Sequence, residues 1–153
     1  MEPRIVRREA FTVMGVIGHF QSAAESFGPL WQAYMAFHEQ IELLSAGEGH
    51  YGVYLGADHA QPMDILAGIV VQEATDTPAG VQVREVPAAT YAVFECLFQE
   101  IGSTYGYIWG EWLWSYYGYA NLEIPREVFG LVIPPGETIV DAGVDSYYGI
   151  YAL

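Results

Sequence analysis

Two glutamates among aromatic residues are the side chains of this sequence best suited to chemistry. Glu111 stands between Trp109 and Trp112 in a helix-like run, and Glu95 follows Phe94 in a strand-like run. A carboxylate that is partly desolvated by such neighbours has a raised pKa, and it can act as a general acid or base or bind a cation. Either glutamate could equally face solvent, as glutamates in helices mostly do. Both interpretations stay open at this point.

Aromatic side chains surround Glu111 on every side of its predicted helix, which runs from Gly102 to about Tyr117. Core packing needs only one stripe of a helix, so we expect other rings to be available to a ligand. One of Trp109 and Trp112 should face that ligand, and the pattern does not distinguish which. A small-molecule site lined by aromatic rings is therefore the second chemical hypothesis.

Few other side chains suggest chemistry. Cys96 is the only cysteine, and because it lies in the apolar run AVFECLF we expect it to pack as a small hydrophobic residue. His38 and Glu42 are four residues apart and provide only two donors, so we expect no metal site. We also expect no cofactor, because no glycine-rich phosphate loop occurs.

The composition favours a soluble protein with one domain that spans residues 1–153. Hydrophobic residues make up 52% of the chain, which is ample for a core. No stretch approaches the roughly 18 consecutive apolar residues that a membrane helix needs, and no export signal opens the chain. We therefore expect a cytoplasmic protein without membrane contact.

The net charge of −14 restricts the partners. All five basic residues are arginines, and they are scattered along the chain. Phosphate backbones are bound by clustered Lys and Arg, so we expect no direct binding of nucleic acid. An acidic surface either attracts cationic ligands or serves only solubility, and both remain open.

The first half of the chain predicts a βαββ unit. RIVRREAFTVMGVIGH alternates like a strand, and Gly28-Pro29 begins a helix whose apolar residues recur at helical spacing as far as the glycines at 47 and 49. Before it, Ser22 to Glu25 has the pattern of a capping box. YGVYLG and DILAGIVV then predict two strands separated by a polar turn.

The second half predicts the same order of elements. VREVPAATYAVFECLF predicts a long strand that bends or lies at an edge at Pro87. A helix follows with Ser103 or Thr104 as N-cap, and then come a strand VFGLVIPPG, a turn and a strand DSYYGIYAL.

The two halves match position by position. A shift of 78 places Trp31 on Trp109 and the strand YGVYL on FGLVI. We therefore predict an α+β fold made of a duplicated βαββ unit, with repeats at about 1–77 and 78–153. Pseudo-twofold pairing would give an antiparallel sheet with two helices on one face and a central ligand groove between them.

Three segments resemble a known family. They are Thr90 to Glu95 (TYAVFE), Ile108 to Leu113 (IWGEWL) and Gly118-Tyr119. Over essentially the whole chain the sequence resembles the GyrI-like family, the effector-binding domain of AraC-type and MerR-type multidrug regulators, as a divergent or engineered stand-alone member. The resemblance implies that bulky, aromatic and often cationic compounds bind in the central cleft. It also implies that some stand-alone members modulate gyrase or hydrolyse reactive toxins.

One position departs from the family pattern. Where the family carries Phe-Glu-x-Tyr, this chain has Phe129 followed by Gly130, Leu131 and Val132. The loss of that glutamate makes a neutral aromatic ligand more plausible. By the repeat, Gly130 and Val132 share the sheet face that Tyr54 occupies in the first unit.

The leading hypothesis is a stand-alone protein that holds a planar hydrophobic or aromatic compound, cationic or neutral, in an aromatic cleft. A hydrolase of reactive hydrophobic toxins, with Glu111 or Glu95 as the catalytic carboxylate, is the alternative, although the balance is against an enzyme. A third interpretation is a domain that binds partners through its acidic surface, and a homodimer is left open. The predicted ligand-binding residues are Tyr54, Trp109, Trp112, Glu111, Phe94, Gly130, Val132 and Trp31.

Overall fold

The computed structural model describes residues 3–22, 25–47, 49–55, 62–72, 76–86, 88–97, 100–112, 137–140 and 149–152. The elements follow one another as β1 (Arg4–Arg8), β2 (Phe11–Phe20), α1 (Gly28–Ile41), the 3-10 turn η1 (Glu42–Leu44), β3 (Tyr51–Leu55), β4 (Met63–Val71), β5 (Gln82–Val86), β6 (Ala89–Glu95), α2 (Ile101–Tyr107), the π-helical turn η3 (Ile108–Trp112), β7 (Glu137–Val140) and β8 (Gly149–Ala152).

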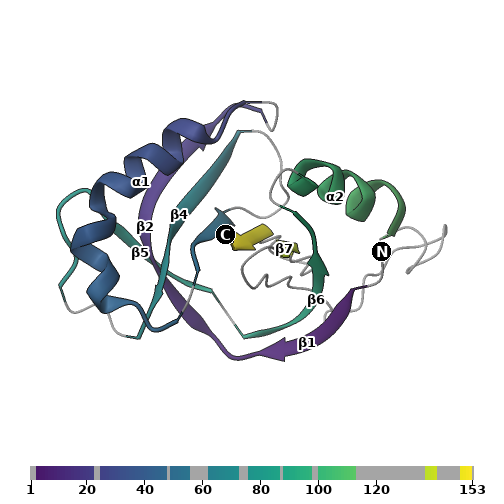
Figure 1. The fold of residues 1–153 in the computed structure, drawn as a ribbon, viewed down its shortest axis with the longest axis horizontal. Helices are drawn as coiled ribbons and strands as arrows, with labels where there is room; N and C mark the ends of the chain where they lie inside the picture. Colours follow the sequence, from purple (N-terminus) through teal and green to yellow (C-terminus); the bar gives the residue numbers. More distant parts are fainter. Residues whose placement is uncertain are drawn as a thin grey trace.

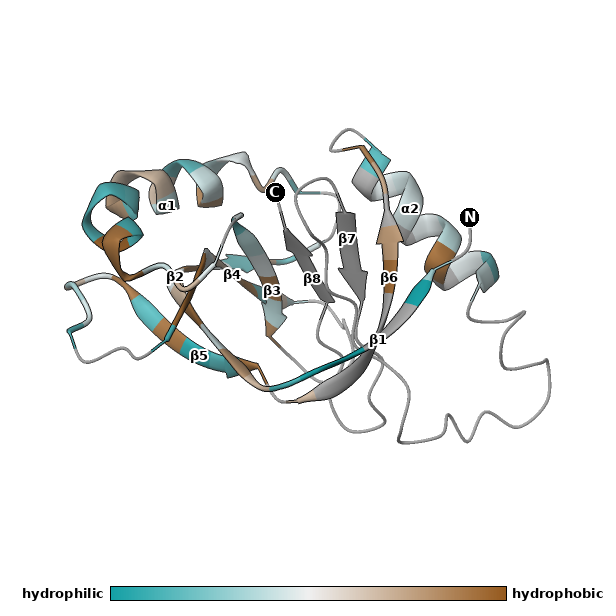
Figure 2. Ribbon diagram, turned by 60° about the horizontal axis from the view of Figure 1, so that its bottom comes forward, coloured by the Kyte–Doolittle hydropathy of each residue, from teal (hydrophilic) through white to brown (hydrophobic). Residues whose placement is uncertain are grey.

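The described strands form one antiparallel sheet in the order β1-β6-β7-β8-β3-β4-β2-β5 (Figure 1). Both α1 and α2 lie on the same side of this sheet, with β3, β7 and β8 between them (Figure 2). The predicted α+β class with an antiparallel sheet is therefore confirmed.

The two ends of the strand order are joined by one long ribbon. Arg8 pairs with Ala89 at the end of β1, and Phe11 pairs with Val86 at the start of β2. From the first pair to the second, the β1–β2 segment moves forward by three residues and the β5–β6 segment moves back by three. The same register therefore continues across the break between β1 and β2 and across that between β5 and β6. The ribbon made of β1–β2 and β5–β6 therefore bends without slipping, and the sheet curls round on itself (Figure 1).

Two glycines permit this curl. Gly15 of β2 and Gly68 of β4 are direct partners across the ladder. A Cβ atom on Gly15 would lie 1.9 Å from the carbonyl oxygen of Ala67, and one on Gly68 would lie 2.1 Å from that of Met14. Only residues without a side chain allow the two backbones to approach so closely.

Helix α1 covers the outer face of the first half of the sheet. Its buried positions are Leu30, Tyr34 and Ile41, at helical spacing, and Pro29 lies in the first turn as predicted. The hydrophobic cluster beneath it consists of Met14, Phe20, Leu30, Tyr34, Ile41, Met63, Ile65, Ala67, Ile69, Val71 and Val81.

The inner face of the curled sheet is packed as well. Val13, Val53 and Leu66 point away from α1, and each is 0% exposed. Each such side chain stabilises the fold by about 1.5–3 kcal/mol relative to leaving it in water. Strand β4 is therefore buried along most of both faces, which explains its high proportion of apolar residues.

Arg8 lies over an aromatic pair at the bend of the ribbon. Its guanidinium carbon is 4.0 Å from the ring centroid of Phe11 and 5.7 Å from that of Tyr51. A cation over an aromatic face stabilises a structure by about 0.5–2 kcal/mol. The bend is thus held by a cation–π contact as well as by the ladder.

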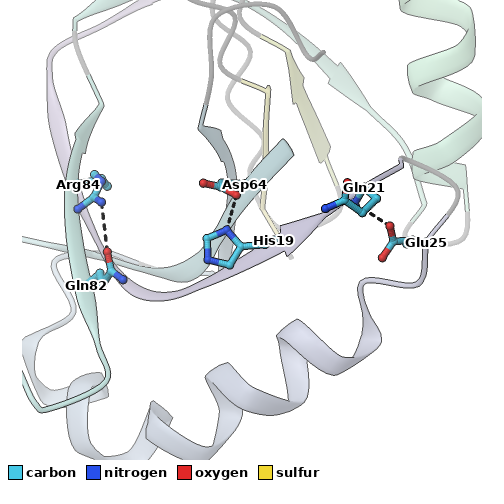
Figure 3. Close-up of polar contacts among 6 residues, drawn as sticks. All are labelled: His19, Gln21, Glu25, Asp64, Gln82 and Arg84. Carbon is cyan, nitrogen blue, oxygen red and sulfur yellow. Dashed lines mark hydrogen bonds and ion pairs between the residues drawn. The ribbon is translucent and has the colours of Figure 1, made fainter. Parts of the chain in front are cut away.

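Polar contacts fix the ends of the strands around α1 (Figure 3). His19 Nδ1 lies 2.5 Å from Asp64 Oδ1 across the β2–β4 ladder, and both side chains are largely exposed. Glu25 Oε1 accepts hydrogen bonds from the backbone N–H groups of Gln21 and Ser22. The predicted capping box therefore closes the turn that precedes α1, whereas the N-cap of the helix is Phe27, without a side-chain cap.

Other predicted boundaries were wrong. Helix α1 ends at Ile41 and passes into η1, so it stops before the glycines at 47 and 49. Ser103 and Thr104 lie inside α2, where the Ser103 hydroxyl donates to the carbonyl oxygen of Glu100. Strand β7 occupies part of the stretch predicted as a turn.

The predicted strand at residues 129–133 and the end of the second helix after Trp112 lie outside the described residues. Within the part of the chain that the structure describes, no helix is long and apolar enough to cross a membrane.

Replacement of Gly68 by alanine should strongly destabilise the protein. The added Cβ atom would overlap the Met14 carbonyl group, a backbone atom that cannot rotate away. We expect the free energy of unfolding, measured by urea denaturation, to fall by about 3 kcal/mol or more. Gly102→Ala in α2 is the matched control, because nothing lies within 4 Å of its added Cβ atom. It should instead stabilise by up to about 1 kcal/mol, and equal effects of the two changes would refute the steric argument.

Candidate functional site

Aromatic rings gather where the start of α1 meets β2 and β3. The ring centroids of Phe20 and Phe27 are 4.8 Å apart, and those of Phe27 and Tyr54 are 6.5 Å apart, both in edge-to-face geometry. Trp31 lies one turn further along α1, with its centroid 5.7 Å from that of Tyr34. We call Phe20, Phe27, Trp31 and Tyr54 the α1 aromatic cluster. Tyr54, Trp31 and Phe27 are only partly buried.

A second group of rings connects β6 to the second helix. The ring centroid of Phe94 lies 5.1 Å from that of Trp112 and 6.3 Å from that of Tyr107, again edge to face. Phe94 is 0% and Trp112 is 8% exposed. We call these three residues the α2 aromatic cluster. Since Trp112 is almost fully buried, it contributes mainly to packing in the described conformation.

Each cluster is built against a different helix. The two helices, α1 and α2, lie on the same side of the sheet (Figure 2). Tyr54 comes from β3, one of the strands that lie between the helices. The structure thus brings Trp31 and Tyr54 into one neighbourhood, and Phe94 and Trp112 into another. A groove that joins the two remains a prediction.

The sequence left two interpretations of Glu111 open, a partly desolvated acid–base residue and a solvent-facing one. In the structure its side chain is exposed, as in the second interpretation. Glu111 lies in the π-helical turn η3. Its role as a catalytic acid or base stays a prediction.

Several predicted site residues lie beyond what the structure describes. Gly130 and Val132 are outside the described ranges, and only the backbone is described for Glu95 and Trp109. Glu95 pairs with Glu137 in the β6–β7 ladder. The roles of these four residues stay predictions.

Burial sets the protonation of the described tyrosines. Removal from water raises the pKa of Tyr54 to about 12. The pKa of Tyr34 is also raised, by burial first and then by the negative charge of Glu42. Both hydroxyl groups are therefore neutral at physiological pH and can donate hydrogen bonds.

A hollow of about 520 Å³ lies at the other end of α1, lined by Leu43, Leu44, Ser45 and Gln72. Among the described side chains, no three of His, Cys, Asp and Glu are grouped so that they could hold a metal ion.

The sequence analysis missed Phe27, which links Phe20 to Tyr54. An aromatic residue directly before Gly28-Pro29 was the available signal, since the residue that enters a helix often packs against its first turns. It also missed the contact between Tyr34 and His50, which joins residues 16 positions apart.

Comparison with known proteins gives a consistent result. The family model of Cass2, described as integron-associated effector binding protein, matches residues 4–127. The transcriptional regulator BrlR of Pseudomonas aeruginosa is 32% identical over 94 residues, which cover 61% of this chain and 34% of BrlR. The chain therefore spans about a third of the length of that curated relative.

Solved structures share the fold. The integron cassette protein VCH_CASS2 from the mobile metagenome of Vibrio cholerae superposes with a TM-score of 0.56 at 14% identity, covering 99% of this chain and 95% of that one. SAV2435, solved with bound tetraphenylphosphonium, has a TM-score of 0.54 at 12% identity, with 99% and 93% of the two chains covered. At these identities the likeness establishes the fold alone.

The burial of Tyr54 should appear as a loss of stability in alkali. In the unfolded chain its phenol ionises near the ordinary value of 10.0, whereas in the folded protein it stays neutral up to about 12. Its stabilising contribution is therefore complete below pH 10 and is lost as the pH rises through that window. We expect Tyr54→Phe to reduce the fall in unfolding free energy between about pH 10 and 12. The raised pKa of Tyr34 accounts for part of the loss of unfolding free energy that remains in the variant. If Tyr54→Phe loses as much unfolding free energy in alkali as the unmodified protein, the assignment of the effect to Tyr54 is contradicted.

Proposed function

Because the chain belongs to the family of integron-associated effector-binding proteins, we propose that it binds a planar hydrophobic or aromatic molecule between its two aromatic clusters. The membership confirms the GyrI-like resemblance of the sequence and places the chain among proteins that bind small-molecule effectors. The observation that supports the finer proposal is that the two helices against which the clusters are built lie on the same side of the sheet (Figure 2).

The α1 aromatic cluster supplies the surface that a ligand would contact. Trp31 and Tyr54 are packed against the core on one side and remain partly exposed on the other. Flat rings held in this way offer stacking area without an entropic cost of ordering.

The α2 aromatic cluster would form the opposite wall. Here the helix widens into η3, and such π turns occur frequently at functional sites. The segment Ile108–Trp112 is also part of the motif on which the family resemblance depends. Widening of the helix at this point supports a binding role, although Trp112 itself is buried.

The ligand charge follows from two opposing effects. A net charge of −14 concentrates cations near the surface, and aromatic faces attract them. Against this, Gly130 stands where the family pattern has a glutamate. We propose that the site accepts both cationic and neutral aromatic compounds, with a modest preference for cations. SAV2435 was solved with a cationic ligand of this kind, tetraphenylphosphonium.

We retain the duplication as part of the proposal. The long ribbon pairs residues 4–15 with residues 82–93. The midpoints of these two segments are 78 positions apart, the same shift that aligns the halves of the sequence. A twofold axis through the bend of the ribbon would therefore relate the two helices and their aromatic clusters.

Titration with tetraphenylphosphonium, followed by tryptophan fluorescence, tests the proposal. We expect saturable quenching, and we expect Tyr54→Ala and Trp31→Ala each to raise the dissociation constant by about tenfold, the loss of one stacking or cation–π contact. Leu43→Ala is the control, because Leu43 is 89% exposed and lines the hollow at the far end of α1. If Leu43→Ala weakens binding and Tyr54→Ala does not, the ligand lies in that hollow and the proposal fails.

Glu111→Gln tests whether a carboxylate contributes. Since Glu111 is exposed, we expect the variant to bind both tetraphenylphosphonium and the neutral triphenylphosphine oxide within about twofold of the unmodified protein. A large loss for the cation alone would instead assign Glu111 to the site as its counter-charge.

A further inference from the structure

A buried polar cluster joins α1 to the residue before β3. Tyr34 Oη lies 2.8 Å from His50 Nδ1, and the ring centroids of His38 and His50 are 5.0 Å apart with the planes at 76°. The Tyr34 ring also lies 5.8 Å from His38 and 5.6 Å from His50. Tyr34 is 0% exposed, whereas His38 and His50 are only partly buried, so this cluster lies at the edge of the core.

The protonation states follow from the surroundings. The raised pKa of Tyr34 keeps its hydroxyl protonated, and we assign that hydroxyl as the donor and His50 Nδ1 as the acceptor, the direction that suits the imidazole tautomer with its proton on Nε2. The pKa of His50 is lowered, first by burial and then by the neighbouring His38. His50 is therefore neutral at physiological pH, with its proton on Nε2.

Few groups nearby could compensate a positive charge on His50. On α1, Glu42 faces His38, with 3.7 Å between Glu42 Oε2 and His38 Nε2, and its side chain is 52% exposed. His38 Nδ1 is buried without a hydrogen-bond partner in the described structure. The members of the core cluster contributed by β4 and the segment before β5 are all apolar: Met63, Ile65, Ala67, Ile69, Val71 and Val81. Two imidazolium rings at this separation would repel each other in a poorly solvated place.

The cluster connects the two elements that carry the exposed rings of the candidate site. Tyr34 packs edge to face on Trp31, one turn earlier on α1. His50 directly precedes β3, which carries Tyr54. The hydrogen bond between Tyr34 and His50 therefore fixes α1 relative to β3, and with it the relative positions of Trp31 and Tyr54.

We propose that Tyr34, His38 and His50 form a proton-sensitive clamp between α1 and β3, which acidification releases so that the aromatic ligand is bound less tightly. The effect on affinity rests on the proposed function, whereas the clamp itself does not. When His50 Nδ1 takes a proton it can no longer accept from Tyr34, and the new charge faces His38. The contact can then persist only with Nδ1–H donating to Tyr34 Oη, which leaves the proton of the fully buried Tyr34 hydroxyl without its partner, and the polar attachment of the helix to β3 is weakened.

The sign of the pH effect follows from His50. Its pKa in the fold lies below the ordinary value of 6.5, so below that pH the unfolded chain binds more protons than the folded one. The contribution of neutral His50 to stability is therefore complete above pH 6.5 and is lost as the pH falls through the folded value. Carboxylates titrate mostly below pH 5, which leaves the range from about 7.5 to 5.5 for histidine.

The matched variant is His50→Asn, whose side-chain oxygen can replace Nδ1 as the acceptor but cannot take a proton in this range. We expect the unmodified protein to lose unfolding free energy between about pH 7.5 and 5.5, and to bind tetraphenylphosphonium at least about fivefold more weakly at the lower pH. His50→Asn should remove most of both changes. His19→Asn, which alters an exposed histidine paired with Asp64, should leave them in place.

The outcomes separate the clamp from the binding site. If tetraphenylphosphonium does not bind at either pH while His50→Asn still flattens the stability profile, the proposed function fails and the clamp stands. If His50→Asn keeps the full pH dependence of stability, the clamp is refuted, whatever the binding result. Tyr34→Phe, which removes the donor, should reduce affinity already at the higher pH, and unchanged affinity there would refute the role of the hydrogen bond in positioning the site.

Discussion

The close approach of β2 and β4 at Gly15 and Gly68 is the constraint on which the rest of the structure depends. Neither position has room for a Cβ atom, because the carbonyl group of the neighbouring strand already occupies that space. The sheet therefore curls at this point, and one face becomes an enclosed, apolar interior. The other face turns outward and takes both helices (Figure 2). Aromatic residues near the helices are thereby divided between packing and a surface that a ligand can reach.

That division explains why aromatic content alone could not locate the site. Phe94 and Trp112 form an edge-to-face pair that is almost fully buried, and this pair holds the second helix to β6. Trp31 and Tyr54 lie against an equally apolar core but keep part of their surface in solvent. The same kind of side chain thus has different uses on the two helices, and the surrounding backbone decides which.

Much of the first half could be predicted because its signals are local. The spacing of Leu30, Tyr34 and Ile41 follows from one helix face, and Gly28-Pro29 marks where that helix begins. The π turn that contains Glu111 could not be predicted, since the periodicity of apolar residues does not reveal it.

Contacts between distant segments were equally inaccessible to local patterns. The bond between Tyr34 and His50 joins a helix to the end of a loop. The partner of Glu95, Glu137, is in a strand where a turn was expected. Both contacts join segments that are separated in the sequence, and the pattern of neighbouring residues along the chain does not reveal them.

The pairing of β1–β2 with β5–β6 also affects the order in which the strands can pair during synthesis of the chain. Arg4 at the start of β1 pairs with Val93, so the first strand has no β6 partner until 93 of the 153 residues have been made. Loop closure over such a span is entropically costly, and folds rich in distant strand pairs form slowly. During synthesis β2 can pair with β4 well before β1 finds β6. The half of the sheet beneath α1 is therefore free to form while the ribosome is still extending the chain, and the curl closes last.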